Sequence, residues 1–187
     1  KFISQYEFKQ YFPRNGWVEH NPNEIWSTTL KALKQVIKKA ISLKGHILTI
    51  GITNQRETTI LWNKKTGKPI YNAIVWQDRR TQEYCKSLKN KNYEKTFRKK
   101  TGLFIDPYFS ATKIKWILDN VKASKKLLKT NNLLFGTVDT FLIWKLTKGK
   151  QHLTEATNAS RTMLFNINNN KWDNEILQKL KIPKFIL

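Results

Sequence analysis

Apolar residues recur along this chain with two periods, one typical of helices and one typical of strands. The clearest helical stretch places apolar residues three or four positions apart, at Trp26, Leu30, Leu33, Ile37 and Ile41. Such spacing puts them on one face of a helix that packs against a core. Asn21 is a favoured N-cap residue and Pro22 fits the first helical position, so we predict that the helix begins there.

Other segments favour strands. Residues 1–12 alternate between polar and apolar side chains. Residues 47–53 are almost all apolar or β-branched, which is typical of a strand buried on both faces. Residues 59–62 and 70–76 flank a polar turn that contains Gly67, and this arrangement predicts a hairpin. Two further strands are expected at residues 133–138 and 163–167.

Helical spacing returns in four later segments, at residues 79–88, 112–121, 139–146 and 172–180. Strands and helices therefore alternate, which predicts an α/β domain in which helices flank a mixed sheet. The 187 residues contain no internal repeat and no linker-like stretch. We therefore expect a single domain with one core.

Composition narrows the class of protein. Hydrophobic residues make up 40% of the chain and aromatic residues 12%, which is not a disordered composition. The only cysteine, Cys85, excludes an internal disulfide and a cysteine-based zinc site. A reducing compartment suits this cysteine content, and no apolar run is long enough for a membrane helix or a signal peptide. We therefore predict a cytoplasmic protein without a membrane partner.

The charge balance raises a second hypothesis. The 35 basic and 13 acidic residues give a net charge of +22, which suggests a basic nucleic-acid-binding module. The lysines are spread through every segment, and asparagine and isoleucine are abundant as well. A solvated surface with a compositional bias explains this spread more simply. We expect no specific nucleic-acid partner and keep the nucleic-acid module as an alternative.

Polar residues that suit a small polyol follow two of the predicted strands. Arg56 and Glu57 come after the apolar run at residues 47–53, at the kind of strand end where ligand crevices form in open α/β sheets. A guanidinium donates to hydroxyl oxygens, and a carboxylate accepts hydroxyl protons. Trp76 ends a second strand, where an indole can cover the carbon backbone of a ligand. Taken singly, the charged pair also fits a surface ion pair or a strand-end cap, and Trp76 also fits a core position.

Few other residues are candidates for a structural or functional role. Asp78 is predicted to cap the helix that follows it. Tyr108 follows a turn at Asp106–Pro107 and offers a ring and a hydroxyl, although the motif alone carries little information. The three histidines have no metal-ligand spacing, and neither a Walker loop nor a GxGxxG pattern occurs. We therefore predict no metal-binding residue, no Ser–His–Asp triad and no cofactor-binding phosphate loop within these 187 residues.

Several segments, in order and across nearly the whole chain, resemble the FGGY family of sugar kinases, and its glycerol kinases in particular. They are FPRNGWVEHNPNEIW, GITNQRETT, IYNAIVWQ, TGLFIDPYFSATKIKWILDN, LLFGTVDTFLIWKLT and TEATNASRTMLFNI. The fourth segment carries the family signature, with Lys113, Trp116 and Asp119–Asn120 in place. The resemblance implies a ribonuclease-H-like, actin-type domain, which is one half of a two-domain kinase whose cleft closes on glycerol and ATP.

The resemblance also assigns roles by position. It implies that Arg56 and Glu57 bind glycerol hydroxyls, that Trp76 lines the apolar side of the pocket, and that Tyr108 contacts glycerol from across the site. For the parent enzyme it implies ATP and Mg²⁺ as cofactors and a homo-oligomeric state. The reaction would be transfer of the γ-phosphoryl group of ATP to glycerol, giving sn-glycerol 3-phosphate in glycerol catabolism.

The chain departs from the family pattern at both ends. Residues 1–187 lack the opening strand with its glycine-containing phosphate loop, the later general-base aspartate, and the C-terminal ATP-binding domain. We therefore expect a partial N-terminal domain that is inactive alone and leaves a sheet edge unpaired. Two alternatives remain: another FGGY kinase, for xylulose, gluconate or a similar sugar, and a shortened paralogue that binds partners without catalysis.

Overall fold

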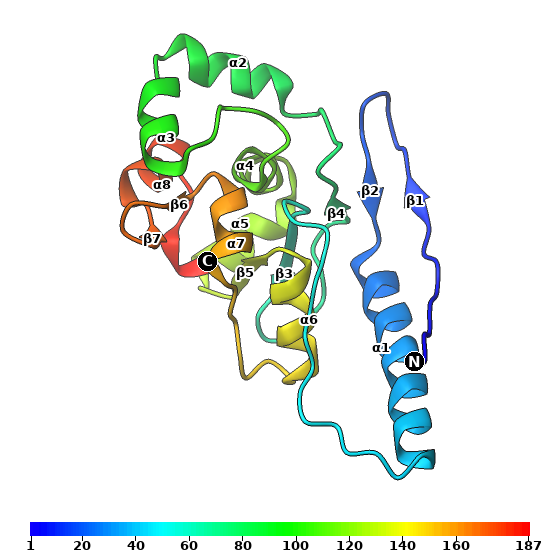
Figure 1. Cartoon of the computed structure of the whole chain (residues 1–187). Coiled ribbons are helices and arrows are strands. Elements are labelled where there is room, and N and C mark those ends of the chain that lie inside the picture. The colour runs from blue at the N-terminus through cyan, green and yellow to red at the C-terminus, as the bar shows by residue number, and fades with distance from the viewer.

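A long helix and a small hairpin lie to one side of the main body of the molecule (Figure 1). In the computed structural model, which describes residues 1–187, the hairpin consists of β1 (Gln10–Tyr11) and β2 (Glu19–His20). It leads into α1 (Pro22–Ser42), whose N-cap Asn21 accepts the N–H of Asn23 at 2.9 Å. The predicted start of this helix is confirmed, whereas the strand predicted over residues 1–12 is limited to β1.

The strands form small antiparallel sheets, so the predicted mixed sheet is wrong. Beyond the hairpin, three antiparallel pairs occur, which are β2 with β4 (Ala73–Ile74), β3 (Ile60–Asn63) with β5 (Leu133–Gly136), and β6 (Phe165–Asn166) with β7 (Lys171–Trp172). Bridges between Thr59 and Ile74 and between Trp62 and Pro69 confirm the predicted hairpin around Gly67. Gly67 has a φ of +67°, a left-handed conformation that favours glycine.

The apolar run at residues 47–53 does not form the predicted buried strand. It is extended and belongs to no sheet, and Leu48 is 94% exposed. The backbone of this segment makes no hydrogen bond with other backbone groups. A strand needs a partner for its backbone N–H and C=O groups, and no segment within residues 1–187 pairs with this one. Because the expected mixed sheet depended on this strand, both predictions fail together.

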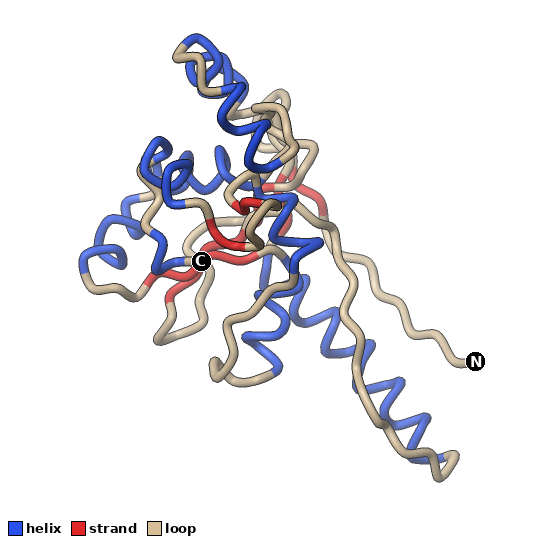
Figure 2. The backbone as a smooth tube through the Cα atoms, turned by 60° about the vertical axis from the view of Figure 1, so that its left-hand side comes forward, coloured by secondary structure: helices blue, strands red, loops and turns tan.

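Seven further helices surround the strands (Figure 2). They are α2 (Gln82–Asn90), α3 (Glu94–Thr101), α4 (Ser110–Asn120), α5 (Lys122–Lys129), α6 (Val138–Leu146), α7 (Ala156–Ala159) and α8 (Asn174–Leu180), with 3₁₀ turns η1 (Ser160–Thr162) and η2 (Lys184–Ile186). The four helices predicted after α1 correspond to α2, α4, α6 and α8. The short helices α3, α5 and α7 were not predicted. No helix has both the length and the apolar character needed to span a membrane.

The sheet of β3 and β5 separates two hydrophobic clusters. Side chains alternate between the two faces of a strand, so Leu61 belongs to the larger cluster, whereas Ile60 and Trp62 belong to the smaller one. The larger cluster surrounds α4, and the smaller cluster includes Phe141 of α6. This arrangement fixes α4, and with it the loop before α4, against the body of the domain.

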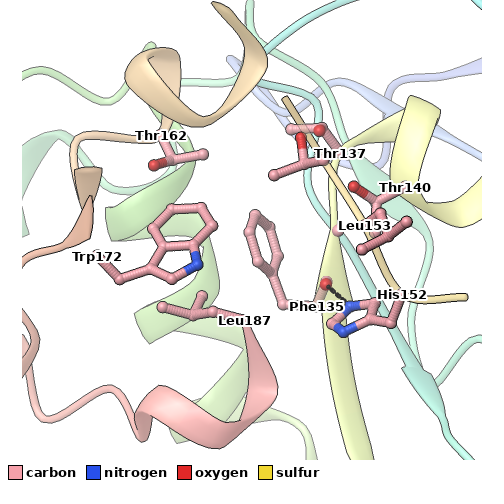
Figure 3. A pocket seen from close by; sticks show the side chains of 10 residues that line it. Phe135, Thr137, Thr140, His152, Leu153, Thr162, Trp172 and Leu187 are labelled. Atoms are coloured by element: carbon pink, nitrogen blue, oxygen red, sulfur yellow. Dashed lines mark hydrogen bonds between the residues drawn. The ribbon is translucent and has the colours of Figure 1, made fainter. Parts of the chain in front are cut away.

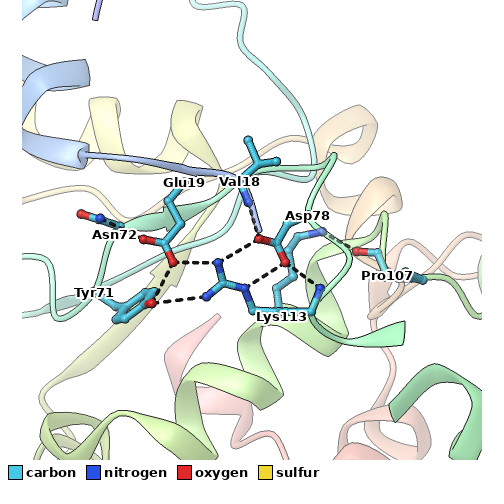
Figure 4. Close-up of polar contacts among 8 residues, drawn as sticks. Val18, Glu19, Tyr71, Asn72, Asp78, Pro107 and Lys113 are labelled. Carbon is cyan, nitrogen blue, oxygen red and sulfur yellow. Dashed lines mark hydrogen bonds and ion pairs between the residues drawn. The ribbon is translucent and has the colours of Figure 1, made fainter. Parts of the chain in front are cut away.

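Arg80 joins the N-terminal hairpin to the main body. Its guanidinium donates to Glu19 of β2 at 2.7 Å and to Asp78 at 2.8 Å, and all three side chains are buried (Figure 4). It also contacts two indoles, 3.8 Å from the ring centroid of Trp17 and 4.6 Å from that of Trp116 on α4. Cation–π contact and buried ion pairing therefore act on the same guanidinium.

Asp78 serves this network and does not cap a helix, so that prediction is wrong. The following helix, α2, begins at Gln82 with Thr81 as its N-cap. The carboxylate of Asp78 accepts the backbone N–H of Val18 at 2.7 Å, in addition to the Arg80 guanidinium. The role of Asp78 is therefore structural: it connects the N-terminal hairpin, at Val18, with the segment that carries Arg80.

Candidate functional site

Glu57 lies in a tight turn immediately before β3. Its backbone has a φ of +65°, which is unusual for a residue other than glycine, and it is only 3% exposed. Its carbonyl oxygen accepts a hydrogen bond from the hydroxyl of Ser110, the first residue of α4, at 3.1 Å. A strained backbone that holds a buried carboxylate is a feature that clusters at functional sites.

Arg161, from the 3₁₀ turn η1, pairs with this carboxylate. Its Nε donates to Oε1 of Glu57 at 2.7 Å, across 104 positions of sequence. The same guanidinium lies 5.7 Å from the ring centroid of Tyr108 and 5.0 Å from that of Phe109. Arg161 was not among the residues predicted for the site. It lies within the segment TEATNASRTMLFNI, but no local spacing links it to Glu57.

Tyr108 and Trp76 form the aromatic side of the same cluster. Their ring centroids are 5.4 Å apart with planes inclined at 53°, and both side chains are half-buried. Contacts therefore run from Glu57 through Arg161 to Tyr108 and on to Trp76. The structure thus brings together three of the four residues predicted for the site, although they come from three separate turns and loops.

Arg56, the fourth predicted residue, directly precedes Glu57 and is exposed. Its side chain makes no hydrogen bond or ion pair within the structure, so all of its N–H donors remain available to a ligand. Oε2 of Glu57 is likewise without a hydrogen-bond donor, because Arg161 binds only Oε1. The consecutive residues Arg56 and Glu57 therefore offer free donors and a free acceptor.

A separate cavity of about 210 Å³ lies between β5, α6 and the C-terminal residues (Figure 3). None of the residues predicted for the site lines it. His152 borders it, with Nε2 2.7 Å from the carbonyl oxygen of Phe135. Burial lowers the pKa of His152, so the imidazole is neutral at neutral pH. Threonine hydroxyls and apolar groups form most of the remaining wall, which suits neither a phosphate nor a cation.

The described residues offer no metal site. No group of three or more His, Cys, Asp or Glu side chains in residues 1–187 is placed to hold a metal ion.

Comparison with known proteins identifies the family. Residues 2–187 match the model for the N-terminal domain of the FGGY family of carbohydrate kinases. The chain belongs to the FGGY family. The predicted family is thereby confirmed, and the α/β class of the fold with it.

The relatives of this FGGY domain include many glycerol kinases. That of Geobacillus sp. (strain WCH70) is 58% identical over 185 residues, which are 99% of this chain and 37% of the relative. That of Borrelia duttonii (strain Ly) is 57% identical over 187 residues, which are 100% of this chain and 38% of the relative. The chain thus spans little more than a third of the length of the curated relatives it matches.

Solved structures show the same fold. Plasmodium falciparum glycerol kinase with ADP aligns with a TM-score of 0.89 at 39% identity, over 95% of this FGGY domain and 35% of that chain. Gluconate kinase from Lactobacillus acidophilus aligns with a TM-score of 0.82 at 23% identity, over 97% of this domain and 35% of that chain. At that identity the similarity to the gluconate kinase shows the fold alone. The ribonuclease-H-like core implied by the family stays a prediction.

Proposed function

We propose that this chain is the acceptor-binding part of a glycerol kinase. The full-length protein would transfer the γ-phosphoryl group of ATP to glycerol and release sn-glycerol 3-phosphate. The observation that carries this proposal is the series of contacts from the buried Glu57 through Arg161 to the ring pair of Tyr108 and Trp76, with the exposed Arg56 next to Glu57 in the sequence. The identity of 58% to a glycerol kinase over 99% of the chain supports it.

Each of the four predicted site residues has a role in this proposal. The Arg56 guanidinium donates to a glycerol hydroxyl oxygen, and Oε2 of Glu57 accepts a hydroxyl proton. The rings of Trp76 and Tyr108 cover the carbon backbone of glycerol. Because Glu57 is buried, a ligand without the matching hydroxyl would displace water from the carboxylate and give it no hydrogen-bond donor in return. The site therefore favours ligands that carry this hydroxyl.

The remaining groups of the reaction belong to other parts of the full-length protein in this proposal. They are the general-base aspartate, the residues that hold ATP and Mg²⁺, and the second domain. Phosphoryl transfer depends on positioning both substrates and on stabilising charge. We therefore predict no glycerol-dependent ATP turnover by residues 1–187 alone. A cytoplasmic location and a homo-oligomeric full-length protein also remain predictions.

Steady-state kinetics of the full-length protein test the function against its nearest rival. With saturating ATP, kcat/KM for glycerol should exceed that for D-xylulose and for D-gluconate by at least about 100-fold. Equal or higher values for a sugar would assign the protein to another branch of the family. A titration with RNA serves as the control for the basic surface, and we expect only weak binding that is lost as salt increases.

We also propose that Arg161 is a positioning residue that holds the Glu57 carboxylate so that Oε2 faces glycerol. Replacing Arg161 with methionine leaves a buried carboxylate without its partner. The KM for glycerol should rise about tenfold, since a hydrogen bond to a charged group contributes roughly 1.5–3 kcal/mol, while the KM for ATP should remain within about twofold. Initial-rate kinetics at varied glycerol and varied ATP measure both.

The matched control is Arg98→Met, because Arg98 is exposed on α3 and contacts only the ring of Phe104 at 4.6 Å. That variant should leave both KM values unchanged. An Arg161→Met enzyme with normal KM for glycerol, or with both KM values raised equally, would refute the positioning role.

A further inference from the structure

Lys113 is a fully buried lysine directly behind the loop that carries Tyr108. It belongs to α4 and is 0% exposed. Its ammonium donates to three consecutive carbonyl oxygens of that loop, at 2.8 Å to Pro107, 2.5 Å to Tyr108 and 3.1 Å to Phe109. Figure 4 draws the first of these bonds. An ammonium has three N–H donors, so each donor has one acceptor.

The three carbonyl oxygens depend on Lys113 alone. No other backbone or side-chain group in the structure donates a hydrogen bond to any of them. Buried carbonyl groups are almost always paired, because an unpaired one loses its hydration without compensation. Lysine is rarely buried completely, since removing its charge from water is unfavourable. Here the three hydrogen bonds to the loop offset part of that penalty.

Other charged groups face Lys113 from the elements packed around it. The carboxylates of Asp78, Glu57 and Asp106 favour its charged form. The thiol of Cys85, whose pKa burial raises to about 11, is neutral near pH 7. Burial is the larger influence, and it lowers the pKa of Lys113 from 10.5 to about 7. The number of N–H donors offered to the loop therefore changes close to neutral pH.

We propose that Lys113 is a positioning residue for glycerol, because its ammonium fixes the backbone of residues 107–109 and so holds the Tyr108 ring against Trp76 and Arg161. This inference rests on the proposed function, in which Tyr108 covers one side of glycerol. In this role Lys113 supports the Tyr108 loop from behind and makes no contact with glycerol. The role is distinct from a general contribution to stability, because the three bonds end on the peptide groups that carry the ligand-facing ring.

The pH dependence of the wild-type full-length protein gives the first test. Below pH about 7 the ammonium has three donors, whereas the neutral amine above this pH has two donors and a lone pair that faces a carbonyl oxygen. The KM for glycerol should therefore rise as the pH increases through about 7, while the KM for ATP should not follow. If the KM for glycerol is constant between pH 6 and 8.5, the proposal fails.

The second test compares two lysine variants of the full-length protein. Lys113→Met keeps the length of the side chain but removes all three donors, and the KM for glycerol should rise roughly 10- to 100-fold with little change in the KM for ATP. The pH dependence should also disappear in this variant. Lys115→Met is the control, because Lys115 lies on the same helix and pairs only with Asp119. An equal change in both KM values for Lys113→Met would overturn the proposal.

Failure of this inference can be told apart from failure of the proposed function. A wild-type protein that does not phosphorylate glycerol would refute the function. The placement of Tyr108 could still be tested through the indole NMR signal of Trp76, which Lys113→Met should shift and Lys115→Met should not. An unchanged signal in Lys113→Met would refute the positioning role on its own. Should Lys113→Met not fold, the wild-type pH profile decides.

Discussion

Replacing Glu57 with glutamine in the full-length protein should lower kcat/KM for glycerol by about 100-fold. A hydrogen bond to a charged acceptor contributes roughly 1.5–3 kcal/mol, and glutamine, although nearly the same size, also weakens the pairing with Arg161 that spans 2.7 Å. The KM for ATP should change little, because Glu57 belongs to the glycerol side of the proposed site. Initial rates measured over a range of glycerol concentrations check this directly.

Glu83→Gln provides the control for this substitution. Glu83 is an exposed residue of α2 that pairs only with Lys86, so its kinetics should match those of the wild type. A Glu57→Gln enzyme whose kcat/KM for glycerol stays within about threefold of the wild type would show that the carboxylate does not bind the substrate.

Replacing Arg80 with methionine should produce the largest loss of stability. The substitution leaves Glu19 and Asp78 buried without their cation, and breaking a buried ion pair in this way typically destabilises by about 3–5 kcal/mol. Loss of the contacts with Trp17 and Trp116 adds to the effect. Urea unfolding of the full-length protein, followed by tryptophan fluorescence, measures the change in the free energy of unfolding.

The neighbouring arginine is a matched control for this experiment. Arg79 pairs with Asp106 at 3.4 Å, but the side chains are 54% and 42% exposed. Exposed ion pairs contribute about 0–1 kcal/mol, so Arg79→Met should have little effect. If the two variants were equally stable, the buried network would not be what joins the N-terminal hairpin to the main body.

Local signals in the sequence predicted the elements whose stability depends on nearby residues. The start of α1 followed from Asn21 and Pro22, and the structure confirms the Asn21 cap. Helix α4 was predicted from the helical spacing of its apolar residues, β3 from its place beside a polar turn, and β5 from its strand-like sequence; all three contribute to the hydrophobic clusters. Helix α3 was missed because EKTFRKKT contains a single large apolar residue, Phe97, which sets no period.

Features that depend on distant partners were not predictable in the same way. The apolar residues at 47–53 have strand character, but a strand exists only when another backbone segment pairs with it, and none does within this chain. The same limit applies to the site. Arg56, Glu57, Trp76 and Tyr108 were predicted as site residues from local chemistry and from the family resemblance. The contact of Arg161 with Glu57 spans 104 positions and needed the structure.

The environment of Lys113 is a third feature that could not be predicted from the sequence. The sequence placed it within the family signature, and the helical period of α4 alone would suggest nothing unusual about a lysine there. Only the fold shows that its ammonium is buried and that it is the sole donor to three carbonyl oxygens. The bonding of a buried charge depends on backbone groups, which sequence patterns do not describe.

The proposal that glycerol binds to Arg56, Glu57, Trp76 and Tyr108 is tested most directly by indole NMR of the full-length protein labelled with ¹⁵N-tryptophan. The signal of Trp76, assigned by its absence in Trp76→Phe, should shift on addition of glycerol without nucleotide. The signal of Trp62, which is fully buried in the smaller cluster, should stay in place. If the protein phosphorylates glycerol while the Trp76 signal does not move, glycerol binds elsewhere and Arg56, Glu57, Trp76 and Tyr108 do not form its site.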